Sequence, residues 1–512
     1  MKALRLKNIK SFMDSGKVEI KPITIFVGKN SCGKSSLIRF PVIISQTMDA
    51  DSDSPIAFYG KKADYGIFED VLRHGSNGQL TFELTYDVDV SLNRLLDKDL
   101  FENGYIVEYM SPKDKYKKED VREVTLSVVL CKIQKKIRVS SLSLLVEEKN
   151  IYEINRVNKE TYSFNVHYNY KAGDFIEQEQ SFTIDNVGFE KFVPCFDIDE
   201  AIEIIYRDIN GEESNQKIDT GFILDRLYFR REKYIDELSD KEKRFLEEWD
   251  AYDYAASLLR RVFSMCQKES DYLRYIGPFR ANPERYYRDL ELFSTGVGVH
   301  GENTSNILIG DSQKKDPKLI YNISRWTKEV LGYEIVLKDI SNGMFQIMLR
   351  DSKGVETNLI DNGYGISQVL PIVTEVTRLQ TNRTPKRLTS SIVDMMTIIE
   401  QPELHLHPAA QSELANLFVD SVLTGKGKKK MLIETHSEHL IRKIQLLVAD
   451  RESLLTNDMV AIYYIDKDKD GFAIVEEMKL LKNGKFEKTW PSGFFDKGYQ
   501  LSRALAKAGK AD

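Results

Sequence analysis

One loop constrains the fold of this chain more than any other feature of its sequence. An apolar run at residues 23–27 leads into Gly28-Lys29-Asn30-Ser31-Cys32-Gly33-Lys34-Ser35, which has the spacing G-x-x-x-x-G-K-S. Glycine lets the backbone of such a loop curl until its N–H groups point at phosphate oxygens, and the N-terminus of a following helix adds the positive end of a dipole. The loop therefore predicts a buried strand, a tight turn and a helix, which together form the phosphate-binding unit of an α/β fold.

The residue types in this loop also predict what it binds. Lys34 can reach the β- and γ-phosphates of a nucleoside triphosphate, and the Ser35 hydroxyl can complete the ligand shell of a magnesium ion. We therefore predict ATP and Mg²⁺ as cofactors. The predicted ATP-binding residues are Gly28, Lys29, Asn30, Ser31, Cys32, Gly33, Lys34, Ser35 and Ser36.

Composition excludes several classes of protein. The 512 residues carry a formal net charge of −6, which argues against nonspecific coating of nucleic acid by the whole surface but leaves room for a local basic patch. No apolar stretch approaches the roughly 18–20 residues that span a bilayer, and the N-terminus has no signal-peptide core. The four cysteines are scattered without a C-x-x-C pair, which indicates reduced thiols. We expect a cytoplasmic protein without a membrane partner.

The pattern of apolar residues divides the chain into blocks. We expect the helix after the loop to run to about residue 50, with a kink at Pro41, and the region from about 79 to 184 to be rich in strands. A helical stretch at about 218–268 follows, and strands then alternate with helices from about 275 onward, which predicts a parallel sheet. The predicted domains are 1–90 (first ATPase lobe), 91–270 (β-rich and helical insertion), 271–480 (second ATPase lobe) and 481–512 (tail).

Acids and histidines at the ends of two predicted strands suggest the chemistry. The strand at 396–399 ends in Glu400, where a P-loop ATPase holds Mg²⁺ through the water shell of the ion. A later predicted strand ends just before His436, which can reach a γ-phosphate or position the attacking water. The alternative is that this turn only caps the next helix, through Thr435 or Ser437. For His405 and His407 a structural or dimer-contact role is favoured over a metal site, because no cysteine or third histidine is near in sequence.

A second glycine-rich segment, residues 361–368, precedes another predicted helix. Its small residues free backbone N–H groups that can bind phosphate. Because the segment is far from Gly28 in sequence, it suggests a nucleotide shared between two subunits. The residues that would contribute from the second subunit are Gly363, Gly365, Ser367 and Gln368.

Taken together, these motifs resemble the ABC-type ATPases of the SMC, RecN and RecF kind. The chain is most similar to the compact bacterial AAA-family group that contains Septu-type anti-phage ATPases and the OLD-family ATPase domain. The resemblance implies an α/β fold, an ABC-type P-loop NTPase head with an inserted β-rich and helical region. It makes the loop Walker A, Glu400 the Walker B acid, His436 the switch histidine and Gly363–Gln368 the signature. Residues 8–12, 275–280 and 490–496 are further marks of this resemblance.

Three departures from the family pattern bear on catalysis. Gln401 stands where these ATPases place a glutamate base, so that hydrolysis is expected to be slow unless Glu403 substitutes. The signature differs from L-S-G-G-Q, with Gly365 at the serine position. The glutamine that ligates magnesium from the Q-loop has a candidate in Gln46, which also fits a plain position on the kinked helix.

The resemblance implies a function and leaves rivals. It implies a homodimer or higher oligomer that binds and slowly hydrolyses ATP and regulates a separate effector, such as an HNH nuclease, in anti-phage defence. One alternative is a RecF- or SMC-like repair ATPase acting on DNA through basic clusters at 113–118, 132–138 and 426–430, although such clusters are more often solvated turns. The other is an ATP-gated scaffold without significant turnover, which Gln401 favours.

Overall fold

The structure is a computed structural model that describes residues 1–91, 120–171, 173–195, 198–210, 220, 238–290, 294–381, 395–424, 428–491, 495 and 504. Its contacts divide the chain into two compact units that alternate along the sequence. Unit 1 consists of residues 1–10, 46–59 and 65–268, and unit 2 of residues 11–45, 60–64 and 269–512. The domain boundaries predicted at 90, 270 and 480 stay a prediction.

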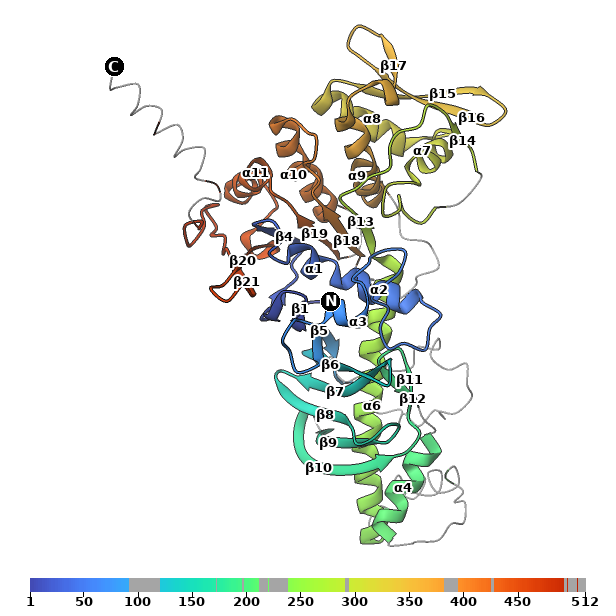
Figure 1. The fold of residues 1–512 in the computed structure, drawn as a ribbon, viewed down its shortest axis with the longest axis vertical. Helices are drawn as coiled ribbons and strands as arrows, with labels where there is room; N and C mark the ends of the chain where they lie inside the picture. The colour runs from blue at the N-terminus through green and yellow to red at the C-terminus, as the bar shows by residue number, and fades with distance from the viewer. Residues whose placement is uncertain are drawn as a thin grey trace. The chain divides into compact units, whose positions relative to one another are not determined.

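Unit 1 contains an antiparallel meander in the strand order β10-β9-β8-β7-β6-β5-β1 (Figure 1). Alternate residues of these strands are buried, as in β6, where Val124, Leu126, Val128 and Leu130 face the core. This period of two is what a sheet with one covered face requires. The strands are β1 (Ala3–Ile9), β5 (Gln79–Asp89), β6 (Val121–Ile133), β7 (Lys136–Val146), β8 (Lys149–Arg156), β9 (Tyr162–Lys171) and β10 (Asp174–Ile184).

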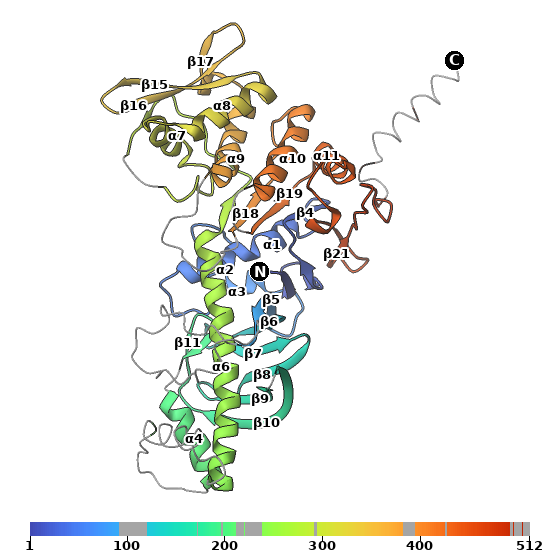
Figure 2. The same cartoon turned by 180° about the vertical axis from the view of Figure 1, so that it is seen from behind.

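A long helix, α6 (Asp240–Tyr272), covers this meander, and Figure 2 shows it running across the strands. Aromatic side chains make the contact: the ring of Tyr252 lies 6.3 Å from that of Tyr152 on β8 and 5.2 Å from that of Phe182 on β10. Such pairs add to the burial of apolar area that holds the helix on the sheet. The smaller elements of this region are α3 (Phe68–Val71), β11 (Gly188–Glu190), β12 (Val193–Cys195) and α4 (Ile198–Asn210).

Unit 2 is built on a six-stranded sheet in the order β13-β18-β19-β4-β20-β21. The first five strands are parallel and β21 is antiparallel to β20. All six residues of β4 are buried, as expected for a central strand covered on both faces. The strands are β4 (Ile23–Gly28), β13 (Arg274–Ile276), β18 (Met395–Glu400), β19 (Lys429–Glu434), β20 (Val460–Lys467) and β21 (Ala473–Glu477), with β2 (Phe12–Asp14) and β3 (Val18–Glu19) preceding them in the chain.

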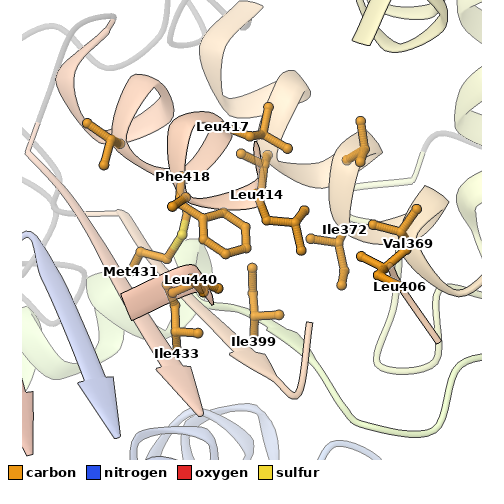
Figure 3. Close-up of a cluster of buried hydrophobic side chains, with 14 of the residues drawn as sticks. Val369, Ile372, Ile399, Leu406, Leu414, Leu417, Phe418, Met431, Ile433 and Leu440 are labelled. Carbon is orange, nitrogen blue, oxygen red and sulfur yellow. The ribbon is translucent and has the colours of Figure 1, made fainter. Parts of the chain in front are cut away.

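Helices pack on this parallel sheet and form the core of unit 2. Figure 3 shows Leu414 and Phe418 of α10 lying over Ile399 of β18 and over Met431 and Ile433 of β19. Burial of each such side chain contributes about 1.5–3 kcal/mol relative to exposure, which fixes the carboxyl ends of these strands in place. The helices of this core are α9 (Tyr364–Thr381), α10 (Pro408–Leu423) and α11 (Glu438–Ala449).

The helix after the phosphate loop differs from its prediction. It is two helices, α1 (Lys34–Ile38) and α2 (Phe40–Asp49), that meet at Arg39. The break falls two residues before Pro41, which lacks an N–H and crowds the preceding turn, so that a single kinked helix does not form. The break matters because Arg39 is the cap of the first helix and lies at the site described below.

Unit 2 also holds a smaller antiparallel sheet, in which β16 lies between β15 and both β14 and β17. The elements of this part are β14 (Tyr287–Arg288), α7 (Thr304–Ser312), α8 (Lys318–Leu331), β15 (Glu334–Ser341), β16 (Met344–Arg350), β17 (Glu356–Asn358) and the 3₁₀ turn η4 (Leu359–Asp361), and a further 3₁₀ turn, η5 (Asn457–Met459), precedes β20. None of the helices in the described ranges is both long and apolar enough to cross a membrane.

Candidate nucleotide-binding site

The phosphate loop follows β4 at the carboxyl edge of the parallel sheet, as the sequence predicts. Gly28 and Gly33 have φ values of 150° and 106°, and Ser31 also has a positive φ of 59°. A Cβ added to Gly28 would lie 2.0 Å from the backbone oxygen of Ile465, and one added to Gly33 would lie 2.5 Å from Ser11 Oγ. Neither position has room for a side chain, so the narrow loop depends on both glycines.

Lys34 is buried and folds back over its own loop. Its Nζ donates hydrogen bonds to the backbone oxygens of Gly28 at 3.1 Å and Lys29 at 2.6 Å. These carbonyls hold the ammonium group at the mouth of the loop, where an anion can compete for it. Lys29 itself points away and pairs with Asp466 at 2.7 Å.

Two carboxylates meet at the ends of neighbouring strands beside this loop. The parallel register of β18 and β19 places Glu400 opposite Glu434, and both residues are buried. Ser35 Oγ donates a hydrogen bond of 2.9 Å to Glu434 Oε2. Burial, reinforced by the charge of Glu400, raises the pKa of Glu434 to about 7, against the smaller opposing effects of Ser35, Lys34 and Arg39.

Glu400 is held by different partners from those of Glu434. Arg39 donates from Nε to Oε1 at 2.5 Å and from Nη2 to Oε2 at 2.6 Å, and the Tyr275 hydroxyl donates to Oε1 at 2.7 Å. Such two-point pairing is the strong form of an arginine–carboxylate contact. Burial, followed by the charge of Glu400, raises the pKa of Tyr275, so that its hydroxyl keeps its proton.

Hydrogen bonds connect the segment that follows β18 with the end of β19 and with Arg280. Arg280 Nη2 donates to the backbone oxygen of Glu400 at 2.5 Å, and burial lowers the pKa of this arginine to about 10. Gln401 adopts a positive φ of 47°, and its N–H donates to the backbone oxygen of Glu434 at 2.7 Å. The side chain of Glu403 accepts hydrogen bonds from the His436 N–H at 2.6 Å and from Thr435 Oγ1 at 2.8 Å. Glu403 therefore braces the turn that carries His436.

The side chain of His436 is exposed beside the loop. Desolvation, followed by the positive charge of Lys34, lowers the pKa of its imidazole, which favours the neutral ring. A neutral imidazole can donate one hydrogen bond and accept another. The alternative of helix capping also holds at this turn, because Ser437 Oγ accepts a hydrogen bond from the N–H of Leu440 at the start of α11.

The second glycine-rich segment forms the start of α9. Gly365 lies against the turn after β18, where an added Cβ would be 2.7 Å from the backbone oxygen of His405. Ser367 and Gln368 are buried, and Ser367 Oγ donates to the backbone oxygen of Tyr364 at 2.9 Å. Gly363 is exposed and has nothing within 4 Å of its added Cβ. The role of this segment toward a second subunit stays a prediction.

The remaining predicted residues lie elsewhere. Gln46 belongs to unit 1, where its Nε2 donates to the backbone oxygen of Ala57, and its place as a magnesium ligand stays a prediction. The basic residues 113–118 and residues 426, 427, 492–494 and 496 are outside the described part of the chain. Within 132–138, Lys132 pairs with Glu69.

Four residues of this site have no role in the prediction from sequence: Arg39, Tyr275, Arg280 and Glu434. A signal was present for Arg39 and for Glu434. Glu434 ends an apolar strand in the same way as Glu400 does, and Arg39 lies four residues after Ser35, a spacing that returns to the same face of a helix.

Comparison with known proteins assigns the family. A family model described as an AAA ATPase domain matches residues 1–441. The chain belongs to this AAA ATPase family. The predicted fold class, an α/β P-loop NTPase head with an inserted β-rich and helical region, is confirmed by this match together with the parallel sheet around β4. No curated protein matches the chain by this comparison.

Solved structures similar to this ATPase include heads of SMC proteins. One is the SMC head domain from Thermotoga maritima, with 11% identity, coverage of 94% of this chain and 99% of that chain, and a TM-score of 0.34. Another is the Smc head domain with an extended coiled coil from Pyrococcus furiosus, bound to the C-terminal domain of ScpA, with 12% identity, 99% coverage of each chain and a TM-score of 0.37. The family assignment rests on the family model.

Proposed function

We propose that this chain is a magnesium-dependent ATPase in which ATP joins two copies and so controls a separate effector. The observation that carries the proposal is the meeting of Lys34 and Ser35 with the acids of β18 and β19 at one edge of the sheet. A serine hydroxyl and carboxylates are the hard oxygen ligands that Mg²⁺ prefers. Among the described residues no three His, Cys, Asp or Glu side chains form a metal site of their own. A site of one hydroxyl and one or two carboxylates beside phosphates is the usual magnesium site of an ATPase.

In the proposed ATPase each residue of the site has its own role. Lys34 exchanges its two backbone acceptors for phosphate oxygens, and the loop N–H groups surround them. His436 orients a water or a γ-phosphate oxygen from the turn that Glu403 braces. Gln401 can orient water through its amide but cannot accept a proton, so that turnover is slow. Magnesium, when bound, stabilises charge that develops on the β- and γ-phosphates.

ATP binding and phosphate release test the first part of the proposal. Lys34→Ala is expected to weaken ATP binding about tenfold or more, because it removes charge-assisted hydrogen bonds to phosphate. Lys314→Ala is a matched control, since Lys314 is an exposed lysine of the same unit that pairs with Asp311. Equal ATP affinity in the two variants would exclude this loop as the nucleotide site.

The proposed pairing of two copies is supported by the surface around the start of α9. The rings of Tyr364 and His405 lie 6.1 Å apart and are exposed there, next to Gly363. Gly363→Arg fits the single chain, because nothing lies within 4 Å of the added Cβ, but it would obstruct a second copy. Light scattering with a slowly hydrolysed ATP analogue should show a dimer for the wild type and a monomer for Gly363→Arg. Gly310→Arg, at another open and exposed glycine, is the control. A wild type whose mass ignores nucleotide would refute the pairing.

The proposed effector, an HNH nuclease in anti-phage defence, is supported by the resemblance of the motifs to Septu-type ATPases. A direct test is phage challenge of cells that carry this chain with its neighbouring genes, compared with cells carrying Lys34→Ala. Protection that survives Lys34→Ala would exclude an ATP-controlled defence role.

A repair ATPase instead predicts stimulation of ATP hydrolysis by DNA and loss of DNA binding when Lys115, Lys117 and Lys118 become glutamate.

A further inference from the structure

Two carboxylates compete for the role of the acid that faces magnesium, and their surroundings differ. In Glu400 both oxygens accept hydrogen bonds from Arg39, and one also accepts from Tyr275. The guanidinium group of Arg39 neutralises this carboxylate. A divalent cation bound to Glu400 would therefore lie next to a fixed positive charge. Such an arrangement is repulsive in a buried site. Glu400 is therefore engaged as the anchor of Arg39.

Glu434 is oriented toward the loop instead. Within the described part of the chain, the donor to its carboxylate is the hydroxyl of Ser35, the residue whose side chain is the predicted magnesium ligand. The strand register brings Glu434 to the level of Phe26 on β4, two residues before Gly28. Its carboxylate therefore lies at the carboxyl end of the sheet, next to the strand that leads into the phosphate loop.

The separation of the two oxygens suits a shared ion. Ser35 Oγ and Glu434 Oε2 are 2.9 Å apart. Adjacent ligands of an octahedral magnesium ion with bonds of about 2.1 Å are about 3.0 Å apart. The two oxygens are therefore spaced as two neighbouring ligands of one ion would be, with the Ser35 hydroxyl keeping its proton and turning it away from Glu434. If a water molecule lies between Glu434 and the ion, the same carboxylate would hold the ion by accepting a hydrogen bond from that water.

We propose that Glu434, rather than Glu400, is the carboxylate that holds the magnesium of bound Mg-ATP together with Ser35, and that Glu400 positions Arg39 and Tyr275. This inference rests on the proposed function, since it concerns the same nucleotide. It reassigns the acid at the end of β18 from metal ligand to structural anchor. The assignment gives β19, which also leads to His436, the metal-binding role in this chain.

The test measures ATP binding by calorimetry in Mg²⁺ and in EDTA, together with the electron paramagnetic resonance of Mn²⁺ bound with a slowly hydrolysed ATP analogue. Glu434→Gln keeps an acceptor for Ser35 but removes the charge. It is expected to lose about tenfold or more in the affinity gained from magnesium and to alter the Mn²⁺ spectrum, while its affinity in EDTA stays within about threefold of wild type. Glu400→Gln is expected to keep the gain from magnesium within about threefold.

Controls separate the possible failures. Glu356→Gln, which removes a half-buried carboxylate on β17 that pairs with Arg350, should behave as wild type, and thermal melting shows whether each variant is folded. Normal ATP binding by the wild type, with the magnesium effect lost in Glu400→Gln and kept in Glu434→Gln, would overturn this inference alone. A wild type that binds no ATP in either buffer would overturn the proposed function and this inference with it.

Discussion

The ion pair between Arg39 and Glu400 allows a quantitative test of how the site is held together. The Glu400 side chain is 2% exposed, and Arg39 provides two of the hydrogen bonds that its carboxylate accepts. Removing one partner of a buried pair typically costs about 3–5 kcal/mol, because the remaining charge loses its compensation. Arg39 itself is 27% exposed, so that solvent can partly replace it, and we expect the lower end of this range, about 3 kcal/mol, for Arg39→Met.

Urea unfolding followed by tryptophan fluorescence can measure this change in unit 2. A Trp249→Phe background leaves Trp326 and Trp490 as reporters, and both belong to unit 2. For a slope of about 3 kcal/mol per molar urea, Arg39→Met should lower the unfolding midpoint by about 1 M. Arg442→Met, which breaks an exposed pair on α11, is the matched control and should leave the midpoint unchanged.

A double variant gives the result that would refute the reasoning. If the cost comes from an unpaired buried charge, Arg39→Met with Glu400→Gln should recover about 2 of the 3 kcal/mol, because the glutamine carries no charge. Equal instability of the single and the double variant would show that lost packing of the Arg39 side chain, rather than electrostatics, stabilises this part of the site.

Three further predictions concern the site and its support. Gln401→Glu should raise the rate of phosphate release about tenfold or more by supplying a base, and an unchanged rate would contradict the missing-base explanation. The pKa of Glu434 is raised to about 7, so the nucleotide-free protein loses stability as the pH rises from about 4.5 through 7. Between pH 5 and 8, the free energy of unfolding of Glu434→Gln, measured with urea, should therefore increase relative to that of the wild type by up to about 3 kcal/mol. A difference that stays constant with pH would contradict this prediction. Lys429 donates to three backbone oxygens at the ends of α9 and α10, and Lys429→Met should destabilise unit 2 by about 2 kcal/mol in the same assay, whereas exposed Lys428→Met should not.

The sequence was informative where chemistry is local. The apolar run before Gly28 and the spacing of Lys34 and Ser35 predict β4, the loop and the start of α1, because each is determined by neighbours in the chain. The strand ending in Glu400 is predicted for the same reason. The break at Arg39 was predicted as a kink at Pro41, because sequence alone does not show whether a proline bends or ends a helix.

The partners of the two acids could not be predicted in this way. Tyr275 reaches Glu400 because β13 pairs with β18 in a register that sets Tyr275 opposite Ile398. That register depends on packing between segments far apart in the chain, which no local pattern records. The difference between Glu400 and Glu434, one bound to arginine and the other to serine, arises from the same long-range pairing.

The place of β4 in its sheet has a consequence for synthesis on the ribosome. β4 ends at Gly28, but its two neighbours, β19 and β20, begin only at Lys429 and Val460. At about 5–20 residues per second, the loop strand leaves the ribosome about 20–80 s before either neighbour exists. Throughout that time the nascent chain carries the phosphate loop without the strands that shape it. An interrupted translation product that lacks β19 and β20 therefore has the loop sequence but no sheet to hold it, and nucleotide binding becomes a property that only chains extended through β20 can acquire.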